Sequence, residues 1–125
     1  MTPNLSSGEL QRSQNFIDGR WCDAVGGAKF AVLNPADDTH IAEVANSSAA
    51  DARSAVDAAQ AAFPAWRATP AKQRALLLKR WNDLILAHQE ELGRLISLEQ
   101  GKPLAEGRGE VAYAASYVEW FAEEA

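Results

Sequence analysis

The side chains that could perform nucleophilic or metal chemistry are few and far apart in this sequence. The chain has one cysteine, Cys22, and two histidines, His40 and His88. A reactive thiol needs a neighbouring base or a positive field, and no histidine lies near Cys22 in sequence. We therefore interpret Cys22 as structural. His88 falls on an apolar stripe and is interpreted as a half-buried histidine rather than a ligand, because no Cys/His group has zinc spacing.

Acidic and aromatic side chains gather near the end of the chain. Paired carboxylates can work as acid and base only when separate elements bring them together. The sequence therefore favours a solvated or interface-facing patch for the acids, which are Glu119, Glu123 and Glu124. The aromatic group consists of Tyr113, Tyr117, Trp120 and Phe121. The sequence favours packing of this group in a core or a subunit interface. The alternative is that the group lines a substrate passage.

A glycine loop for phosphate binding is missing from the sequence. Gly107-Arg108-Gly109 is too short for one and does not follow a predicted strand. We therefore expect neither catalytic nor cofactor-binding residues within these 125 residues.

Composition excludes several classes of partner. Hydrophobic residues make up 47% of the chain and charged residues 23%, which is typical of a globular protein. The net charge is −5 and the cations are scattered, so nucleic-acid binding is not expected. No apolar run approaches the roughly 20 residues that span a membrane. The polar start lacks the features of a signal peptide, and a single cysteine fits a reducing compartment, so we expect a cytoplasmic protein.

The first part of the chain predicts short strands joined by tight turns. We interpret residues 1–14 as a flexible leader. Residues 16–21 (FIDGRW) predict a hairpin, because Asp-Gly supplies the positive φ angles of a two-residue turn. Residues 29–33 predict a strand that stops at Asn34-Pro35, and residues 40–44 alternate like another strand. These strands predict a small antiparallel β element.

From Asn46 the apolar period becomes helical. Ser47 or Ser48 can cap a helix, with Asp51 as the acid of its first turn. We expect this helix to end at Pro64, with Trp66 packed in the corner that follows.

A second helical pattern begins after Thr69-Pro70. It carries one long apolar stripe: Leu78, Trp81, Ile85, Leu92 and Leu95. Some 30 helical residues without interruption are unusual in a globular domain, so we expect a break near Gln89. Gly101, with Pro103 just beyond it, predicts the end of this segment.

The last predicted helix starts between Leu104 and Gly109. One face of it is apolar and small: Val111, Ala115, Val118 and Ala122. The sequence ends in acidic residues and has no glycine, proline or basic last turn there. Acidic residues at the C-terminus of a helix oppose the helix dipole. We therefore expect the natural helix to continue past Ala125, which would make this chain a fragment truncated within a helix.

Five motifs follow one another from Asn15 onward: residues 16–21 (FIDGRW), 30–37 (FAVLNPAD), 61–80 (AAFPAWRATPAKQRALLLKR), 98–106 (LEQGKPLAE) and 110–125 (EVAYAASYVEWFAEEA). In this order they resemble the NAD(P)-dependent aldehyde dehydrogenase family. The Tyr-x-x-Trp-Phe pattern followed by acids, in the last motif, is similar to the succinate-semialdehyde dehydrogenase branch.

The resemblance implies an α/β parent protein of which residues 15–125 form the N-terminal part of the cofactor-binding domain. This portion should be mostly helical, with about three helices and a small antiparallel β element. The parent should oxidise succinate semialdehyde to succinate with NAD or NADP, and should be a homo-oligomer, a dimer or a tetramer. The family's catalytic cysteine and glutamate have no counterpart here, so the resemblance implies that this chain alone is inert and binds no cofactor tightly.

Two lesser sites also follow from the resemblance. Some family members hold a monovalent cation with strand carbonyls and an acid, and the matching positions are Val32, Leu33 and Glu99. The family acid is commonly aspartate, so Glu99 departs from the pattern. Residues on the helix after Gly-Lys-Pro approach the mouth of the aldehyde tunnel, and the matching candidates are Glu110, Tyr113, Ala114 and Tyr117.

Two alternatives stay open at this point. The substrate could be glutarate semialdehyde or another small aldehyde, since no residue here separates these substrates. The chain could also be a stand-alone helical interaction module that self-associates through the aromatic face of its last helix.

Overall fold

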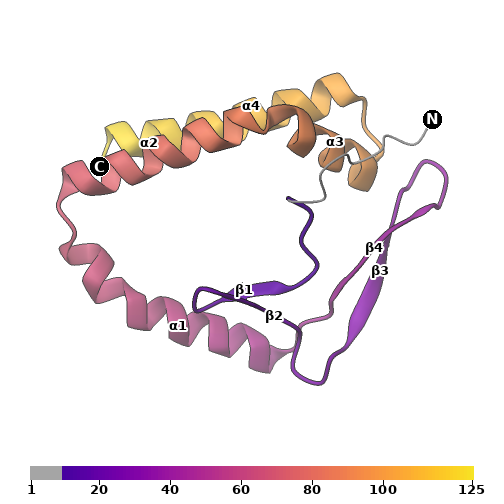
Figure 1. Ribbon diagram of the computed structural model, residues 1–125, viewed down its shortest axis with the longest axis horizontal. Helices are drawn as coiled ribbons and strands as arrows, with labels where there is room; N and C mark the ends of the chain where they lie inside the picture. The colour runs from indigo at the N-terminus through magenta and orange to yellow at the C-terminus, as the bar shows by residue number, and fades with distance from the viewer. Residues whose placement is uncertain (1–9) are drawn as a thin grey trace. The chain divides into compact units, whose positions relative to one another are not determined.

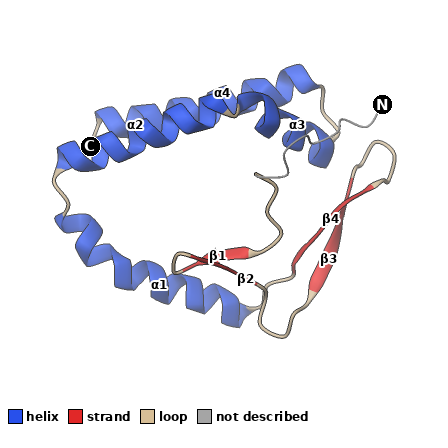
Figure 2. Cartoon of the chain, viewed as in Figure 1, coloured by secondary structure: helices blue, strands red, loops and turns tan. Residues whose placement is uncertain are grey.

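The computed structural model describes residues 10–125, which form two β-hairpins and four helices (Figures 1 and 2). The described part is mostly helical with short antiparallel strands, as the sequence predicts. Most of the predicted leader, residues 1–9, lies outside the described residues. None of the helices in residues 10–125 has the length and apolar character needed to cross a membrane.

The described chain divides into two compact units. The hairpin unit comprises Arg12–Leu33 and Asp38–Ala68, and so contains all four strands and the first helix. The helical unit contains Asn34–Asp37 and Thr69–Ala125, and so holds the other three helices.

The first hairpin forms around the Asp-Gly turn. Strands β1 (Asn15–Ile17) and β2 (Arg20–Cys22) pair antiparallel with Phe16 opposite Trp21. The turn residues Asp18 and Gly19 have φ angles of 51° and 73°, as the predicted two-residue turn requires.

The second hairpin pairs β3 (Lys29–Leu33) with β4 (His40–Ala45). Its register places Phe30 opposite Val44 and shifts between Val32 and Leu33. The predicted strands are confirmed, but they form two separate two-stranded sheets rather than one.

Helix α1 (Ala49–Ala68) begins at a capping network centred on Asp51. The Asp51 carboxylate accepts hydrogen bonds from the backbone N–H groups of Val25 and Ser48, at 2.8 and 2.7 Å, and from the Ser48 hydroxyl at 2.8 Å. Ser48 Oγ in turn accepts the N–H of Ala50 at 3.2 Å. Of the two predicted caps, Ser48 is therefore the one used, and Asp51 also ties the helix to the preceding loop.

The predicted end of α1 at Pro64 is wrong. The helix continues through Pro64 to Ala68. Proline removes one backbone donor, but the alanine-rich sequence on both sides favours helix. The helix ends instead at Ala68, because Thr69, the residue before Pro70, is disfavoured in the helical region. Trp66 is not packed in a corner: 44% of its surface is exposed.

The helical unit contains α2 (Ala71–Ala87), α3 (Gln89–Gln100) and α4 (Leu104–Glu123). The predicted break near Gln89 falls at His88, whose φ and ψ are −105° and 17°. This break raises the helix count in the described residues to four, against the expected three or so. Gly101 ends α3 with a φ of 70°, as predicted, because glycine adopts this left-handed conformation without a steric penalty.

Helices α2 and α4 lie side by side and run in opposite directions (Figure 1). Lys79 on α2 binds Glu123 near the end of α4 at 2.7 Å. The apolar core of this unit lies on the small face of α4, where Val111, Ala115 and Ala122 are buried. Three of the four residues predicted for this face are therefore buried, and Val118 is half-buried.

Helix α3 crosses α4 at two buried glycines, Gly93 and Gly107. A methyl group on Gly107 would overlap the carbonyl oxygen of Gly93 and lie 2.8 Å from Ser97 Oγ. A methyl group on Gly93 would lie 3.0 Å from the backbone nitrogen of Arg108. The two helix backbones can approach this closely only because neither position carries a side chain.

The crossing predicts opposite effects for two neighbouring glycines of α4. Gly107→Ala should lower the free energy of unfolding by about 1–3 kcal/mol, because overpacking forces the helices apart. Gly109→Ala should raise it by about 0.5–1 kcal/mol, because nothing lies within 4 Å of the added methyl group and alanine favours helix. Urea unfolding followed by far-UV circular dichroism measures both. Equal effects of the two substitutions would contradict the close crossing.

Candidate functional site

An apolar groove lies between the three helices of the helical unit. Its walls come from residues three or four positions apart on each helix, which therefore share one helix face. Two acids, Glu99 and Glu110, also line it. We call this site the three-helix groove, and its apolar walls are formed by Trp81, Ile85, Leu92, Leu95, Ile96, Val111 and Ala114.

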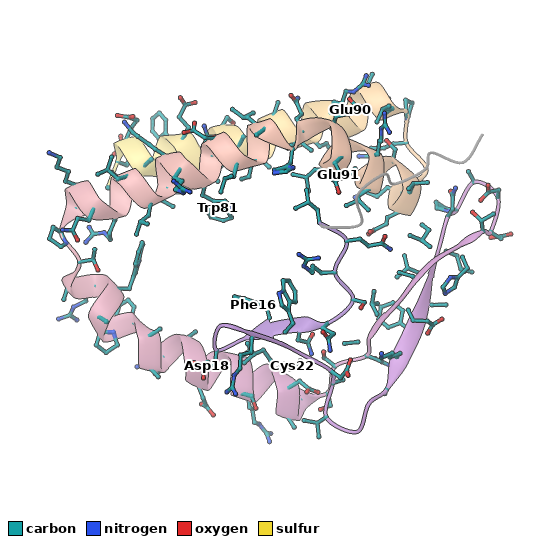
Figure 3. All side chains as sticks on the ribbon, in the orientation of Figure 1. Phe16, Asp18, Cys22, Trp81, Glu90 and Glu91 are labelled. Atoms are coloured by element: carbon teal, nitrogen blue, oxygen red, sulfur yellow. The ribbon has the colours of Figure 1, made fainter. Side chains whose placement is uncertain are left out.

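Four of the five residues of the predicted apolar stripe line one side of this groove, and Leu78 does not line it. Trp81 and Ile85 come from α2, and Leu92 and Leu95 come from α3, so the stripe continues past the break at His88. Trp81 stands out from α2 with 56% of its surface exposed (Figure 3). The sequence predicted the stripe, but it did not predict that the stripe and α4 would leave a groove between them.

A charged cluster fixes α3 against α4 next to the glycine crossing. The Arg108 guanidinium donates to both carboxylate oxygens of Glu90, at 2.6 and 2.9 Å, and Arg94 donates to the same carboxylate at 3.0 Å. Glu90, labelled in Figure 3, is the first acid of α3. The hydrogen bond from Arg108, with a further contribution from Arg94, lowers the pKa of Glu90 to about 2.

The structure separates the four residues predicted for a tunnel mouth. Glu110 and Ala114 line the three-helix groove, and Glu110 binds Lys102. Tyr113 and Tyr117 instead pair with each other on α4: their hydroxyl oxygens are 2.5 Å apart and their ring centroids 5.0 Å apart, edge to face. This hydrogen bond raises the pKa of Tyr117. The tunnel role of all four residues stays a prediction.

The aromatic group of α4 does not pack into a core of the described chain. Tyr113, Tyr117, Trp120 and Phe121 are between 50% and 64% exposed. Their predicted packing in a core therefore does not occur within residues 10–125.

The side chains considered as a nucleophile or a base do not form a catalytic pair. Cys22 Sγ lies 3.6 Å from the carbonyl oxygen of Asn15. His40 binds Glu43 at 3.1 Å, and His88 lies 3.9 Å from Glu91. Residues 10–125 contain no group of three or more histidine, cysteine or acidic residues that could hold a metal ion.

The glycines of α4 do not fit a dinucleotide phosphate. Gly107, Arg108 and Gly109 lie inside the helix rather than in a loop between a strand and a helix. The backbone of Gly107 faces Gly93, and the Arg108 side chain is bound to Glu90. These three residues therefore offer no phosphate cradle.

The cation site inferred from the resemblance stays a prediction. Val32 and Leu33 stand at the register shift of β3, in the hairpin unit. Glu99 is in the last turn of α3, in the helical unit.

Residues 21–125 match the aldehyde dehydrogenase family. The chain belongs to this family.

Curated relatives include two semialdehyde dehydrogenases. The chain is 50% identical to the NADP⁺-dependent succinate-semialdehyde dehydrogenase of Escherichia coli, over 96% of this chain and 25% of the relative. It is 51% identical to the glutarate-semialdehyde dehydrogenase of Pseudomonas aeruginosa, over 97% of this chain and 25% of the relative.

A solved structure reproduces the described fold. The succinate-semialdehyde dehydrogenase of Burkholderia pseudomallei matches with a TM-score of 0.93 and 45% identity, over 97% of this chain and 25% of that chain. The chain therefore spans about a quarter of the length of the relatives it matches. The match includes the aromatic helix and favours the dehydrogenase interpretation over a stand-alone interaction module.

The ion pair at the helix crossing predicts a pH-dependent stability. The pKa of Glu90 is about 2 in the folded chain and near its ordinary value of 4.5 in the unfolded chain. The contribution of the ionised Glu90 to the free energy of unfolding is therefore complete above pH 4.5 and is lost as the pH falls toward 2. Glu90→Gln should lower the melting temperature at pH 7, and its deficit should shrink between these pH values until it disappears. Melting curves of both proteins between pH 7 and pH 2 test this prediction. A difference in melting temperature that does not change with pH would contradict the role of the charge.

Proposed function

We propose that this chain forms the N-terminal part of the cofactor-binding domain of an NAD(P)-dependent aldehyde dehydrogenase that oxidises succinate semialdehyde to succinate. The observation that carries the proposal is the identity of 50% to the E. coli enzyme across nearly the whole chain. The high TM-score to a second enzyme named for the same substrate supports it.

The proposed substrate class is a short aldehyde with a carboxylate at its far end. Succinate semialdehyde and glutarate semialdehyde share this chemistry and differ by one methylene group. Identities of 50% and 51% to enzymes named for these two substrates do not separate them. Glutarate semialdehyde is therefore the second candidate.

Within this enzyme the chain would act as a scaffold and would be inert alone. When bound, NAD(P)⁺ accepts the hydride that leaves the aldehyde carbon. Gly107, Arg108 and Gly109 lie inside α4 and form no phosphate cradle, so the binding of the cofactor and the covalent chemistry would belong to other parts of the enzyme. The E. coli relative is named as an NADP⁺-dependent enzyme, which supports NADP⁺ as the cofactor.

The lesser sites belong to the same proposal. Glu110, Tyr113, Ala114 and Tyr117 would approach the aldehyde tunnel, and Val32, Leu33 and Glu99 would hold a monovalent cation. We also propose a cytoplasmic homo-oligomer, a dimer or a tetramer. The free thiol of Cys22 supports a reducing compartment, and the family resemblance supports the oligomer.

A chimeric enzyme tests the proposal. In the chimeric enzyme, this chain replaces the matching segment of the E. coli succinate-semialdehyde dehydrogenase. We expect the chimera to oxidise succinate semialdehyde, measured as formation of NADPH, because about half of the exchanged residues are identical. A chimera that shows a cooperative melting transition but oxidises neither succinate nor glutarate semialdehyde would contradict the proposal.

A further inference from the structure

We propose that Asp18, in the turn between β1 and β2, is a site of spontaneous covalent modification, at which the main chain rearranges through a cyclic imide to isoaspartate. The rearrangement needs an aspartate whose carboxyl carbon can be reached by the backbone nitrogen of the next residue. This inference goes beyond the proposed function and does not rest on it, because it concerns only the chemistry of one hairpin.

The reaction uses atoms of Asp18, Gly19 and water. The backbone nitrogen of Gly19 attacks Cγ of Asp18, so that an N–Cγ bond forms, a Cγ–O bond breaks, and the oxygen leaves as water with the amide and carboxyl protons. Water then opens the resulting succinimide. Attack at Cγ restores aspartate, whereas attack at the main-chain carbonyl carbon of Asp18 breaks its bond to nitrogen and leaves the chain connected through the side chain. The net change is an isomerisation, and it consumes no other reactant.

The first argument is the identity of the residue that follows Asp18. Among all the aspartates and asparagines of the chain, only Asp18 precedes a glycine. Glycine has no side chain to hinder the approach of its own nitrogen. The space around Gly19 is open as well, because nothing lies within 4 Å of the position that a Cβ atom would occupy. The attacking atom is therefore as unhindered as the chain allows.

The second argument is that the Asp18 carboxyl group is accessible and weakly held. Its side chain is 74% exposed, and its ion pair with Arg20 spans 3.6 Å between two exposed side chains, which makes it a weak one. Asp51 shows the contrast. It is 5% exposed, and its carboxylate accepts hydrogen bonds from Val25 and Ser48. The Asp18 carboxyl group can turn toward the neighbouring nitrogen, whereas that of Asp51 is fixed by its donors.

The third argument is the low stability of the hairpin that carries Asp18 (labelled in Figure 3). Strands β1 and β2 have three residues each and form a sheet of their own. A hairpin with only two strands is marginally stable and opens locally. The φ angle of Asp18 is 51°, in the left-handed region that costs energy for a residue with a side chain. Opening relieves this cost and gives the turn the freedom that ring closure needs.

The modification would be incompatible with the hairpin. Isoaspartate adds one carbon atom to the main chain within a turn of two residues, and the strand register depends on that turn. The pairing of Phe16 with Trp21, whose ring centroids are 5.0 Å apart, would then be lost. Residue 18 would thus convert the hairpin from a paired to an unpaired state that does not reverse on refolding.

Incubation of the purified 125-residue chain in mildly acidic H₂¹⁸O tests the proposal. Opening of the imide adds ¹⁸O to residue 18, so peptide mass spectrometry should find the label there. An isoaspartate-specific carboxyl methyltransferase should methylate the same peptide. We expect both signals to grow with time, at a rate within about tenfold of that in a synthetic peptide of residues 12–24, because opening of the hairpin slows the reaction little.

Two variants of the chain separate this chemistry from an effect on folding. Asp18→Glu keeps the charge, but its side chain would have to close a larger ring, which forms far more slowly, so both signals should be lost. Trp21→Ala removes the ring contact with Phe16 and should bring the rate closer to that of the peptide. A loosened hairpin speeds the reaction, so loss of the signals in Asp18→Glu cannot come from a destabilised turn.

Two results would overturn the proposal. One is a residue 18 that gains ¹⁸O and methyl groups more than about tenfold more slowly than the synthetic peptide, or not at all, which would show that the folded turn protects Asp18. The other is equal labelling and methylation of the Asp18→Glu chain, which would place the reaction at another residue.

Discussion

The close crossing of α3 and α4 at Gly93 and Gly107 is the constraint on which the helical unit depends. No side chain separates the two backbones there, so the distance between the helices is fixed by main-chain atoms. Arg108, adjacent to Gly107, reaches across the crossing to Glu90. The crossing thereby determines where Val111 and Ala114, one and two turns further along α4, meet the residues of α3.

Scaffold and chemistry are divided in this part of the aldehyde dehydrogenase fold. The described residues build rigid local structures: two tight hairpins, a capped helix and a glycine crossing. They bring together neither a thiol with a base nor a glycine loop with a helix N-terminus. Their apolar side chains remain largely uncovered. These features fit a segment whose contribution to an enzyme is to hold other segments in place.

Local signals made much of the fold predictable. Asp18-Gly19 determines its hairpin through φ angles that few other residues tolerate, and Ser48 with Asp51 begins α1 through hydrogen bonds three residues apart. The excessive length of the second helical pattern was enough to predict the break at His88. Pro64 was misread, because its effect depends on whether the flanking alanines continue the helix.

The site was less predictable because it depends on contacts between distant residues. In the sequence Gly107 belonged only to a glycine pattern too short for phosphate binding, and only its partner Gly93 explains it as a packing position. The stripe from Trp81 to Leu95 was evident from periodicity, but a groove exists only once α4 is placed beside it. Tyr113 and Ala114 are neighbours in sequence, yet helix geometry directs one to Tyr117 and the other to the groove.

If this chain is the non-catalytic N-terminal part of a dehydrogenase, as proposed, it should not oxidise an aldehyde by itself. The most direct test incubates the purified 125-residue chain with succinate semialdehyde and with either NAD⁺ or NADP⁺, in the presence of a reducing thiol, and follows the formation of reduced cofactor. We expect a rate no higher than that measured without protein. Reduced cofactor formed in proportion to the amount of chain, and lost when Cys22 is replaced by serine, would contradict it.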